Sequence, residues 1–334
     1  MTRASIQTVY VQPTVAFKIN PMWSLGVGPI VGHSAVELSQ ALDLADQRLP
    51  GIDTTRTFAN IGIARRTEFG RAKLAGDAWG FGFAAGLHGV LNERWQVGIR
   101  YLHKIDFAYD GADATFTQTN TGLRFGGAVP GAFTAGSSID SVLQPQFTST
   151  GRLGTQTVNT KIAHPAQVQA GFTYTGWTNT DLSVEYAWLG WKAFKELPVD
   201  FENTTPETTA PDRALIEDYN NASSIRAGLE HRFTSGFASG WAGRLGASAA
   251  TSAAPPETVT PLLPEQDRYT LNLGAGIPLT TRWALDASYA YVGTWGSRGR
   301  IDERTSRAQT AAQLNTGFFR LSANILSISL KATY

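Results

Sequence analysis

The sequence predicts an all-β protein, a transmembrane antiparallel up-and-down β-barrel, and three observations support this fold class. About eleven segments alternate apolar and polar residues, which indicates strands with one apolar face. The connections between these segments alternate between short and long. The last segment, residues 317–334, keeps the alternation and finishes on the aromatic Tyr334. Such a C-terminal strand is typical of bacterial outer-membrane barrels, so we expect this protein in that membrane.

The composition is compatible with a membrane barrel. The chain has 334 residues, which we expect to form one domain over 1–334, and 16% of them are charged, against about 25% in typical globular proteins. The sequence contains no run of about 18 apolar residues, the length that a transmembrane helix requires. Barrel strands need no such run, because each strand exposes only every second residue to lipid.

Other classes of function find no support in the composition. The net charge is +1 and the basic residues are scattered, which gives no indication of a nucleic-acid partner. Cysteine is absent, and the five histidines lack metal-site spacing. We therefore expect no cofactor and no metal.

The expected strands follow one another along the whole chain. In each, one phase carries large apolar residues, as in residues 79–91, where Trp79, Phe81 and Phe83 alternate with Gly80 and Gly82. The expected strands are residues 5–19, 23–38, 79–91, 95–107, 158–175, 182–194, 223–233, 241–253, 268–279, 283–295 and 317–334. Their apolar phases include Val9, Val27, Phe81, Ile99, Phe172, Val184, Leu229, Leu271, Leu285 and Leu326.

The charged residues provide a second test of the barrel. They fall on the phase opposite the large apolar residues: Arg100, Lys104, Asp106, Glu185, Arg226, Glu230, Arg232, Arg244, Arg268, Asp286 and Lys331. A lipid-facing Lys or Arg near the membrane midplane costs about 2–4 kcal/mol, so this phase should face the lumen. A soluble sandwich with an apolar core is the alternative, and it predicts the same alternation.

The connections favour the membrane barrel over the soluble alternative. The long ones are expected at about residues 38–77, 110–156, 195–219, 254–267 and 297–315, with short turns between them, as in outer-membrane barrels. Tryptophans adjoin the short turns: Trp23, Trp95, Trp177, Trp241 and Trp283. Five of nine tryptophans at one end indicate an aromatic girdle at a membrane interface.

Two long connections carry apolar residues. Residues 35–47 have apolar spacing that predicts a short amphipathic helix. Residues 122–136 are rich in Gly, Ala and Phe, although a loop in water has no need of such residues. Either these loops fold over one another, or they form an apolar landing site for a hydrophobic ligand.

Three motifs resemble a known family. Residues 76–82 (GDAWGFG), 95–111 (WQVGIRYLHKIDFAYDG) and 263–269 (LPEQDRY) are similar, in order and spacing, to motifs of the FadL-like long-chain fatty-acid outer-membrane transporters. This family includes aromatic-hydrocarbon uptake channels. The resemblance extends over essentially the whole chain, and the helix expected at 35–47 falls where the family carries a helical outer loop.

The resemblance implies a fourteen-stranded barrel plugged by an N-terminal hatch. Aligned by its motifs, the chain begins at the family's fourth strand, so the signal peptide, the hatch and three strands are expected to be missing. A sheet without its first strands has two unpaired edges, which lipid cannot satisfy. We therefore expect a fragment, or a sheet that is open or strained.

The resemblance also implies the function, which is passive uptake of long-chain fatty acids or similar hydrophobic molecules across the outer membrane. The outer loops would form a capture groove, with Leu42, Leu44, Phe125, Val129 and Phe133 as candidate contacts. In the lumen, Arg226, Arg244 and Arg268 could hold a carboxylate head group. The alternative for these arginines is pairing with Glu185, Glu230 and Asp286.

Other functions remain open at this stage. An aromatic-hydrocarbon channel of the same shape would need no lumen cation. A non-transporting structural barrel is also possible. An outer-membrane enzyme is disfavoured, because there is no GxSxG motif and His164 lies beside Pro165 with no obvious partner. Expected partners are hydrophobic small molecules, outer-membrane lipid and lipopolysaccharide, and the barrel is expected to be a monomer.

Overall fold

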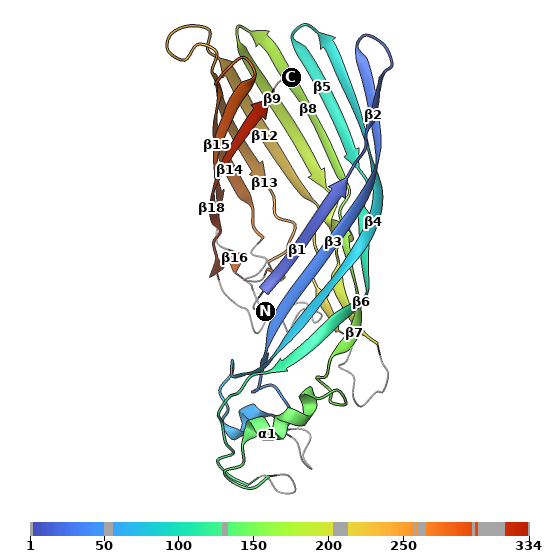
Figure 1. The fold of residues 1–334 in the computed structure, drawn as a ribbon, viewed down its shortest axis with the longest axis vertical. Coiled ribbons are helices and arrows are strands. Elements are labelled where there is room, and N and C mark those ends of the chain that lie inside the picture. The colour runs from blue at the N-terminus through green and yellow to red at the C-terminus, as the bar shows by residue number, and fades with distance from the viewer. Residues whose placement is uncertain are drawn as a thin grey trace.

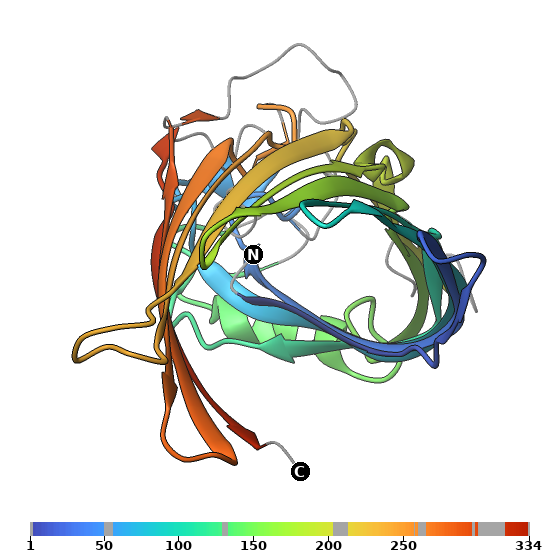
Figure 2. The same cartoon turned by 90° about the horizontal axis from the view of Figure 1, so that it is seen from above.

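The computed structural model describes residues 3–49, 56–128, 133–202, 213–256, 258–259, 265–295, 298–299 and 318–332. They form a tall, curved antiparallel wall (Figures 1 and 2), with short turns at one end and long connections at the other. The strands of the first half are β1 (Arg3–Val11), β2 (Val15–Lys18), β3 (Trp23–Asp43), β4 (Glu68–Asn92), β5 (Trp95–Leu102), β6 (Ile105–Gln118), β7 (Gln156–His164) and β8 (Gln167–Trp177).

The second half continues the wall. Its strands are β9 (Thr180–Leu189), β10 (Glu196–Phe201), β11 (Arg213–Ile216), β12 (Ala222–Arg232), β13 (Ala242–Ala250), β14 (Arg268–Pro278), β15 (Trp283–Thr294) and β18 (Ser322–Ala332). A separate pair is β16 (Arg298–Gly299) with β17 (Phe318–Phe319). The helices are α1 (Ile139–Leu143) and the 3-10 turns η1 (Phe58–Ile61), η2 (Gln144–Phe147) and η3 (Trp191–Ala193). No helix in these ranges is long and apolar enough to cross a membrane.

The sixteen strand segments of the large sheet make eleven passes along the wall. Five passes each consist of two consecutive segments that lie end to end. These segments are β1 with β2, β5 with β6, β7 with β8, β9 with β10 and β11 with β12. The eleven passes correspond one to one to the strands that the alternation predicts. The all-β antiparallel fold class is therefore confirmed.

The five breaks fall at one height of the wall, which we call the break level. Leu102 pairs with Ala84 and Gln167, Gln167 pairs with Leu189, and Leu189 pairs with Ala222. The broken strands all change segment beside this row of pairs, whereas β3 and β4 run through it. On the short-turn side the wall is wide. On the loop side, β1, β6, β7, β10 and β11 continue with β3 and β4 as a narrower extension.

The amphipathic helix predicted at residues 35–47 is wrong. Strand β3 runs to Asp43 and pairs with β4, with Val36 opposite Gly76 and Leu38 opposite Leu74. Val36 and Leu38 lie on the inner face, in the apolar core of the extension. The apolar residues of this segment are two or four positions apart, a pattern compatible with a strand as well as with a helix. Hydrogen bonding to β4 makes the segment a strand. The short helix of this end of the molecule is α1, in the connection after β6.

The strands also extend further toward the long connections than the sequence predicts. The connection expected at 38–77 shrinks to the stretch between Asp43 and Glu68, and the one expected at 110–156 begins after Gln118. Strands β10 and β11 lie inside the connection expected at 195–219. The outward faces of these extensions carry charges, such as Glu37 and Lys73, which are 3.0 Å apart, and this obscures the alternation.

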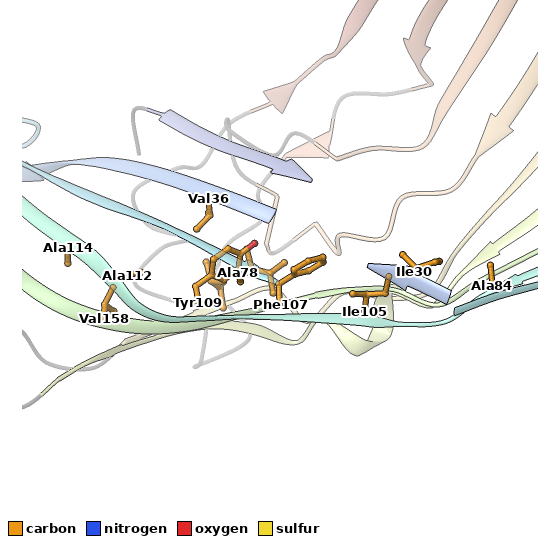
Figure 3. Close-up of a cluster of buried hydrophobic side chains, with 12 residues drawn as sticks. Ile30, Val36, Ala78, Ala84, Ile105, Phe107, Tyr109, Ala112, Ala114 and Val158 are labelled. Carbon is orange, nitrogen blue, oxygen red and sulfur yellow. The ribbon is translucent and has the colours of Figure 1, made fainter. Parts of the chain in front are cut away.

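The extension holds its own apolar core, shown in Figure 3. Between Gly76 and Phe83, β4 has no ladder to β6. The pairs Ala84–Leu102 and Ala75–Asp113 bound this stretch, and between them the chain of β5 and β6 is longer than that of β4. Inner-face glycines accommodate β6 there. A Cβ at Gly80 would lie 2.6 Å from Ile105. Ile105 and Phe107 are almost fully buried against this glycine face.

Adding one methyl group to Gly80 should therefore disrupt the extension. We expect Gly80→Ala to cost about 1–3 kcal/mol through overpacking against Ile105 and Phe107. Gly86→Ala on the same face of β4 is the matched control, because the nearest atom to its Cβ is the Ile99 carbonyl oxygen at 3.4 Å. Urea titration of the refolded protein measures both variants. Equal stability of the two would show that the glycine face does not hold β6.

On the short-turn side the outward face of the wall is apolar, as the charge phase predicts. Lys104 and Asp106 are exceptions: Ile105 and Phe107 point into the inner core of the extension, so these two charges lie on the outward face, where Asp106 pairs with Lys104 and Lys161. Phe81 is 70% exposed and Leu326 is 73% exposed, and both are large side chains of the phase expected to face lipid. The five tryptophans expected beside short turns lie at that end of the wall. Four occupy strand ends, as Trp95 does at the start of β5 and Trp177 at the end of β8, and Trp241 immediately precedes β13. This arrangement fits a lipid-facing surface.

The first and last passes are each paired on one side within the described residues. Strands β1 and β2 pair with β3, and β18 pairs with β15 (Figure 2). This agrees with the expectation of an open sheet. The wall has eleven antiparallel passes, of which β1 belongs to the first and β18 forms the last, so β1 and β18 run in the same direction. Direct closure would therefore make a parallel pair, unlike every other pair in the wall.

Candidate functional site

The concave face of the wide, short-turn half carries an open cavity of about 690 Å³. Strands β2, β3, β4, β5, β8 and β9 line it. Its wall is built from small residues, including Gly86, Gly98 and Gly171, and from the polar side chains Gln96 and Gln169. A Cβ at Gly98 would find its nearest neighbour at 3.9 Å. The alternation thus places lipid-facing bulk outside and leaves room inside.

Arg100 on β5 is the cation of this cavity. Its Nη1 donates a hydrogen bond to the Oε1 of Gln169, 3.3 Å away on the neighbouring strand. Within the part of the chain that the structure describes, no carboxylate forms an ion pair with Arg100. A guanidinium in this position keeps donors available for a ligand oxygen.

The three arginines predicted as head-group ligands all have carboxylate partners. Arg226 lies 3.0 Å from Glu185, and Arg268 lies 2.9 Å from Glu265. Arg244 lies 2.7 Å from Glu230 and also donates to Asp286. Arg226 and Arg244 are therefore paired with carboxylates on other strands, which was the alternative to head-group binding. Arg268 is also paired, with a glutamate that was not among the expected partners.

Arg244 also borders a second hollow of about 490 Å³. The hollow lies over β13, β14, β15 and β18, and its side chains include Asn272, Ser288 and Ser327. Glu230 lies on β12, next to the β13 strand of Arg244, and Asp286 lies on β15, on the far side of β14. This group therefore ties together the wall from β12 to β15. We find no cluster of three or more acidic or histidine side chains able to hold a metal ion in the described ranges.

The apolar residues predicted in the long connections come together in one place, which we call the loop cluster. Leu44 and Phe125 are almost fully buried there, and Leu42 and Phe133 are partly buried against them. The rings of Phe125 and Phe133 stack with centroids 5.0 Å apart. Val129 lies outside the described residues. The loops thus fold over one another, and Leu44 and Phe125 are covered by protein.

Sequence reasoning missed most of this cluster. Phe58, Phe69, Ile139 and Leu143 are almost fully buried in it. Phe58 and Ile139 lie on the helical turns η1 and α1, and Ser138 caps α1 by accepting a hydrogen bond from the Ser141 amide. An isolated Phe or Ile in a polar loop gives no periodic signal, so the serine cap before residues 139–143 was the available clue.

Comparison with known proteins identifies the family. A family model described as "Outer membrane protein transport protein (OMPP1/FadL/TodX)" matches residues 2–334. A 47 kDa outer membrane protein of Pasteurella multocida (strain Pm70) is 26% identical over 229 residues. That alignment covers 66% of this chain and 45% of the relative, so the chain matches less than half the length of that protein.

Solved structures share the fold. A Pseudomonas aeruginosa FadL homologue aligns with a TM-score of 0.71 at 19% identity, over 98% of this chain and 68% of that one. The Pseudomonas putida toluene transporter TodX aligns with a TM-score of 0.59 at 12% identity, over 99% and 70%. The Ralstonia pickettii toluene transporter TbuX gives 0.57 at 15%, over 99% and 69%. The expected outer-membrane location and barrel fold are confirmed, and the chain belongs to the OMPP1/FadL/TodX family of outer-membrane transport proteins.

Proposed function

We propose that this protein admits long-chain fatty acids or similar hydrophobic anions passively across the outer membrane, through the 690 Å³ cavity. The family fold supports a channel for hydrophobic substrates. The observation that carries the finer proposal is Arg100, a cavity cation without a carboxylate partner among the described residues. A cation of this kind suits the carboxylate head of an amphiphile, whose apolar tail can follow the glycine and alanine wall.

The family's aromatic-hydrocarbon channels provide the second candidate. The arginines first considered as head-group ligands are neutralised by neighbouring carboxylates, as Arg244 is by Glu230 and Asp286. A neutral aromatic needs no free cation, and this pairing favours such a ligand in the second hollow. In either case the protein acts as a monomer embedded in outer-membrane lipid and lipopolysaccharide, with no enzymatic step and no cofactor.

A charge substitution in the cavity separates the two candidates. We expect Arg100→Gln to weaken fatty-acid uptake roughly ten- to a hundredfold in apparent affinity, the effect of one hydrogen bond to a charged group. Uptake of toluene should be unchanged. Uptake of both labelled compounds by cells that lack other transporters of this family measures the two effects.

The control removes the same charge outside the cavity. Arg94 lies in the exposed turn before β5, and Arg94→Gln should leave both uptakes unchanged. Arg244→Ala and Arg268→Ala should also spare fatty-acid affinity, because both arginines are committed to carboxylates. Normal fatty-acid uptake by Arg100→Gln, together with loss in Arg244→Ala, would contradict this assignment and return the head group to Arg244.

A further inference from the structure

We propose that Tyr10, Phe107 and His164 form a gate between the loop end of the molecule and the cavity. In this proposal the hydrogen bond between Tyr10 and His164 holds the gate closed. The proposal rests on the proposed function, because a gate matters only where a hydrophobic ligand passes. It assigns a role to side chains that neither the strand pattern nor the ion pairs explain.

The three side chains come from separate parts of the wall. Tyr10 lies on β1, Phe107 on β6 and His164 at the end of β7. Strands β1 and β7 are not neighbours, since β3, β4 and β6 lie between them. Nevertheless the Tyr10 hydroxyl and His164 Nδ1 are 2.6 Å apart. This hydrogen bond therefore reaches across the concave face rather than along a ladder.

The aromatic rings fill the space that the hydrogen bond spans. The Phe107 and His164 ring centroids are 4.9 Å apart, and those of Tyr10 and Phe107 are 6.4 Å apart. Both Tyr10 and Phe107 lie on Gly32 of β3, where a Cβ would come within 3 Å of either ring. The two rings can occupy this space because Gly32 has no side chain.

The three residues lie beside the cavity, on its loop side. All lie on the loop side of the break level, close to the breaks at 12–14, 103–104 and 165–166. Gln12, two residues after Tyr10, already lines the cavity. On the other side, Phe107 belongs to the buried core of the extension (Figure 3). A ligand moving from the long connections into the cavity therefore meets these rings.

Tyr10 is the movable part of the gate. Phe107 is fully buried, whereas Tyr10 remains 41% exposed and sits on an edge strand with one neighbour among the described residues. Strand edges with few buried contacts open locally at low cost. A second link holds β1 nearby, since the Thr8 and Ser34 hydroxyls are 2.8 Å apart. Loss of the Tyr10 bond should thus free the ring without detaching the strand.

The first experiment measures ion conductance of the purified chain in planar bilayers, which requires no hydrophobic substrate. Tyr10→Phe keeps the ring and removes the hydroxyl. We expect conductance to rise roughly two- to tenfold, because the loss of one net hydrogen bond shifts the equilibrium between closed and open gate by about this factor. Tyr186→Phe is the matched control, because the Tyr186 hydroxyl bonds Ser223 at 2.8 Å on the outward face. Equal conductance of the two variants would overturn the gate.

The second experiment locks the gate. Because the chain has no cysteine, Tyr10→Cys with His164→Cys offers a unique pair for a short bifunctional methanethiosulfonate reagent. Cross-linking should abolish the conductance and the uptake of fatty acid, and reduction should restore both. Unchanged conductance after cross-linking would contradict the gate. Blocked conductance with undiminished uptake would instead leave the gate intact and show that hydrophobic substrates do not use this cavity.

Discussion

Replacing Gly98 with Trp is expected to lower the uptake of hydrophobic molecules roughly five- to a hundredfold. Gly98 faces the cavity, and the first atom near its Cβ lies 3.9 Å away, so the indole can enter the cavity without disturbing the strand. Forcing a ligand past added bulk costs about 1–3 kcal/mol, and this cost raises the transport barrier by the stated factor. Initial rates of labelled fatty-acid uptake, at matched expression, measure the change.

The adjacent residue provides the control. Ile99 points outward and is 49% exposed, so Ile99→Trp adds the same group to the lipid-facing surface. We expect this variant to transport normally and to fold normally, because aromatic residues are tolerated on that face. If Gly98→Trp transports as fast as Ile99→Trp, ligands do not pass through the cavity.

Replacing Phe125 with Ala is expected to destabilise the loop cluster by about 3–5 kcal/mol, because it leaves a void in the packed cluster. Phe125 is 2% exposed, stacks on Phe133 and packs near Phe58. Hydrogen exchange reports the loss locally. The amide of Phe125 donates to the Ser137 carbonyl, and the Ile139 amide donates to Leu123, so both amides should exchange roughly a hundredfold faster or more.

Phe237→Ala is the control for the loop cluster. Its side chain is 96% exposed in a short turn, and its loss should leave exchange at Phe125 and Ile139 unchanged. The same pair of variants separates the two interpretations of the apolar loops. If Phe125→Ala keeps normal protection but loses ligand capture, the cluster serves as a landing site rather than as a packed core.

The strand pattern was predictable because lipid imposes it on every pass. Residues on the outward phase, such as Phe81 and Leu273, face lipid and must be apolar. Residues on the opposite phase can be small or charged. This signal survives without tertiary information and yields the eleven passes and the inward direction of the charges on the short-turn side of the wall. It fails in the extension beyond the break level, where outward residues such as Glu37 and Lys73 form ion pairs.

Side-chain partners could not be read from the sequence. The phase places Arg244, Glu230 and Asp286 on the inner face, but only the register puts Arg244 between the two carboxylates. No partner for His164 was evident from the sequence, whereas the structure pairs it with Tyr10, 154 positions away. That contact depends on how the edge strand curves over the wall, which no local pattern encodes.

Photolabelling can locate the binding site of hydrophobic molecules, which we expect to be the lumen cavity. A fatty acid with a diazirine on its chain would be bound to the purified protein and irradiated, and the adducts located by mass spectrometry. We expect adducts on inner-face residues of β5 and β8, such as Gln96 and Gln169, which line the cavity. Adducts confined to outward residues such as Phe81 and Leu273 would contradict this expectation.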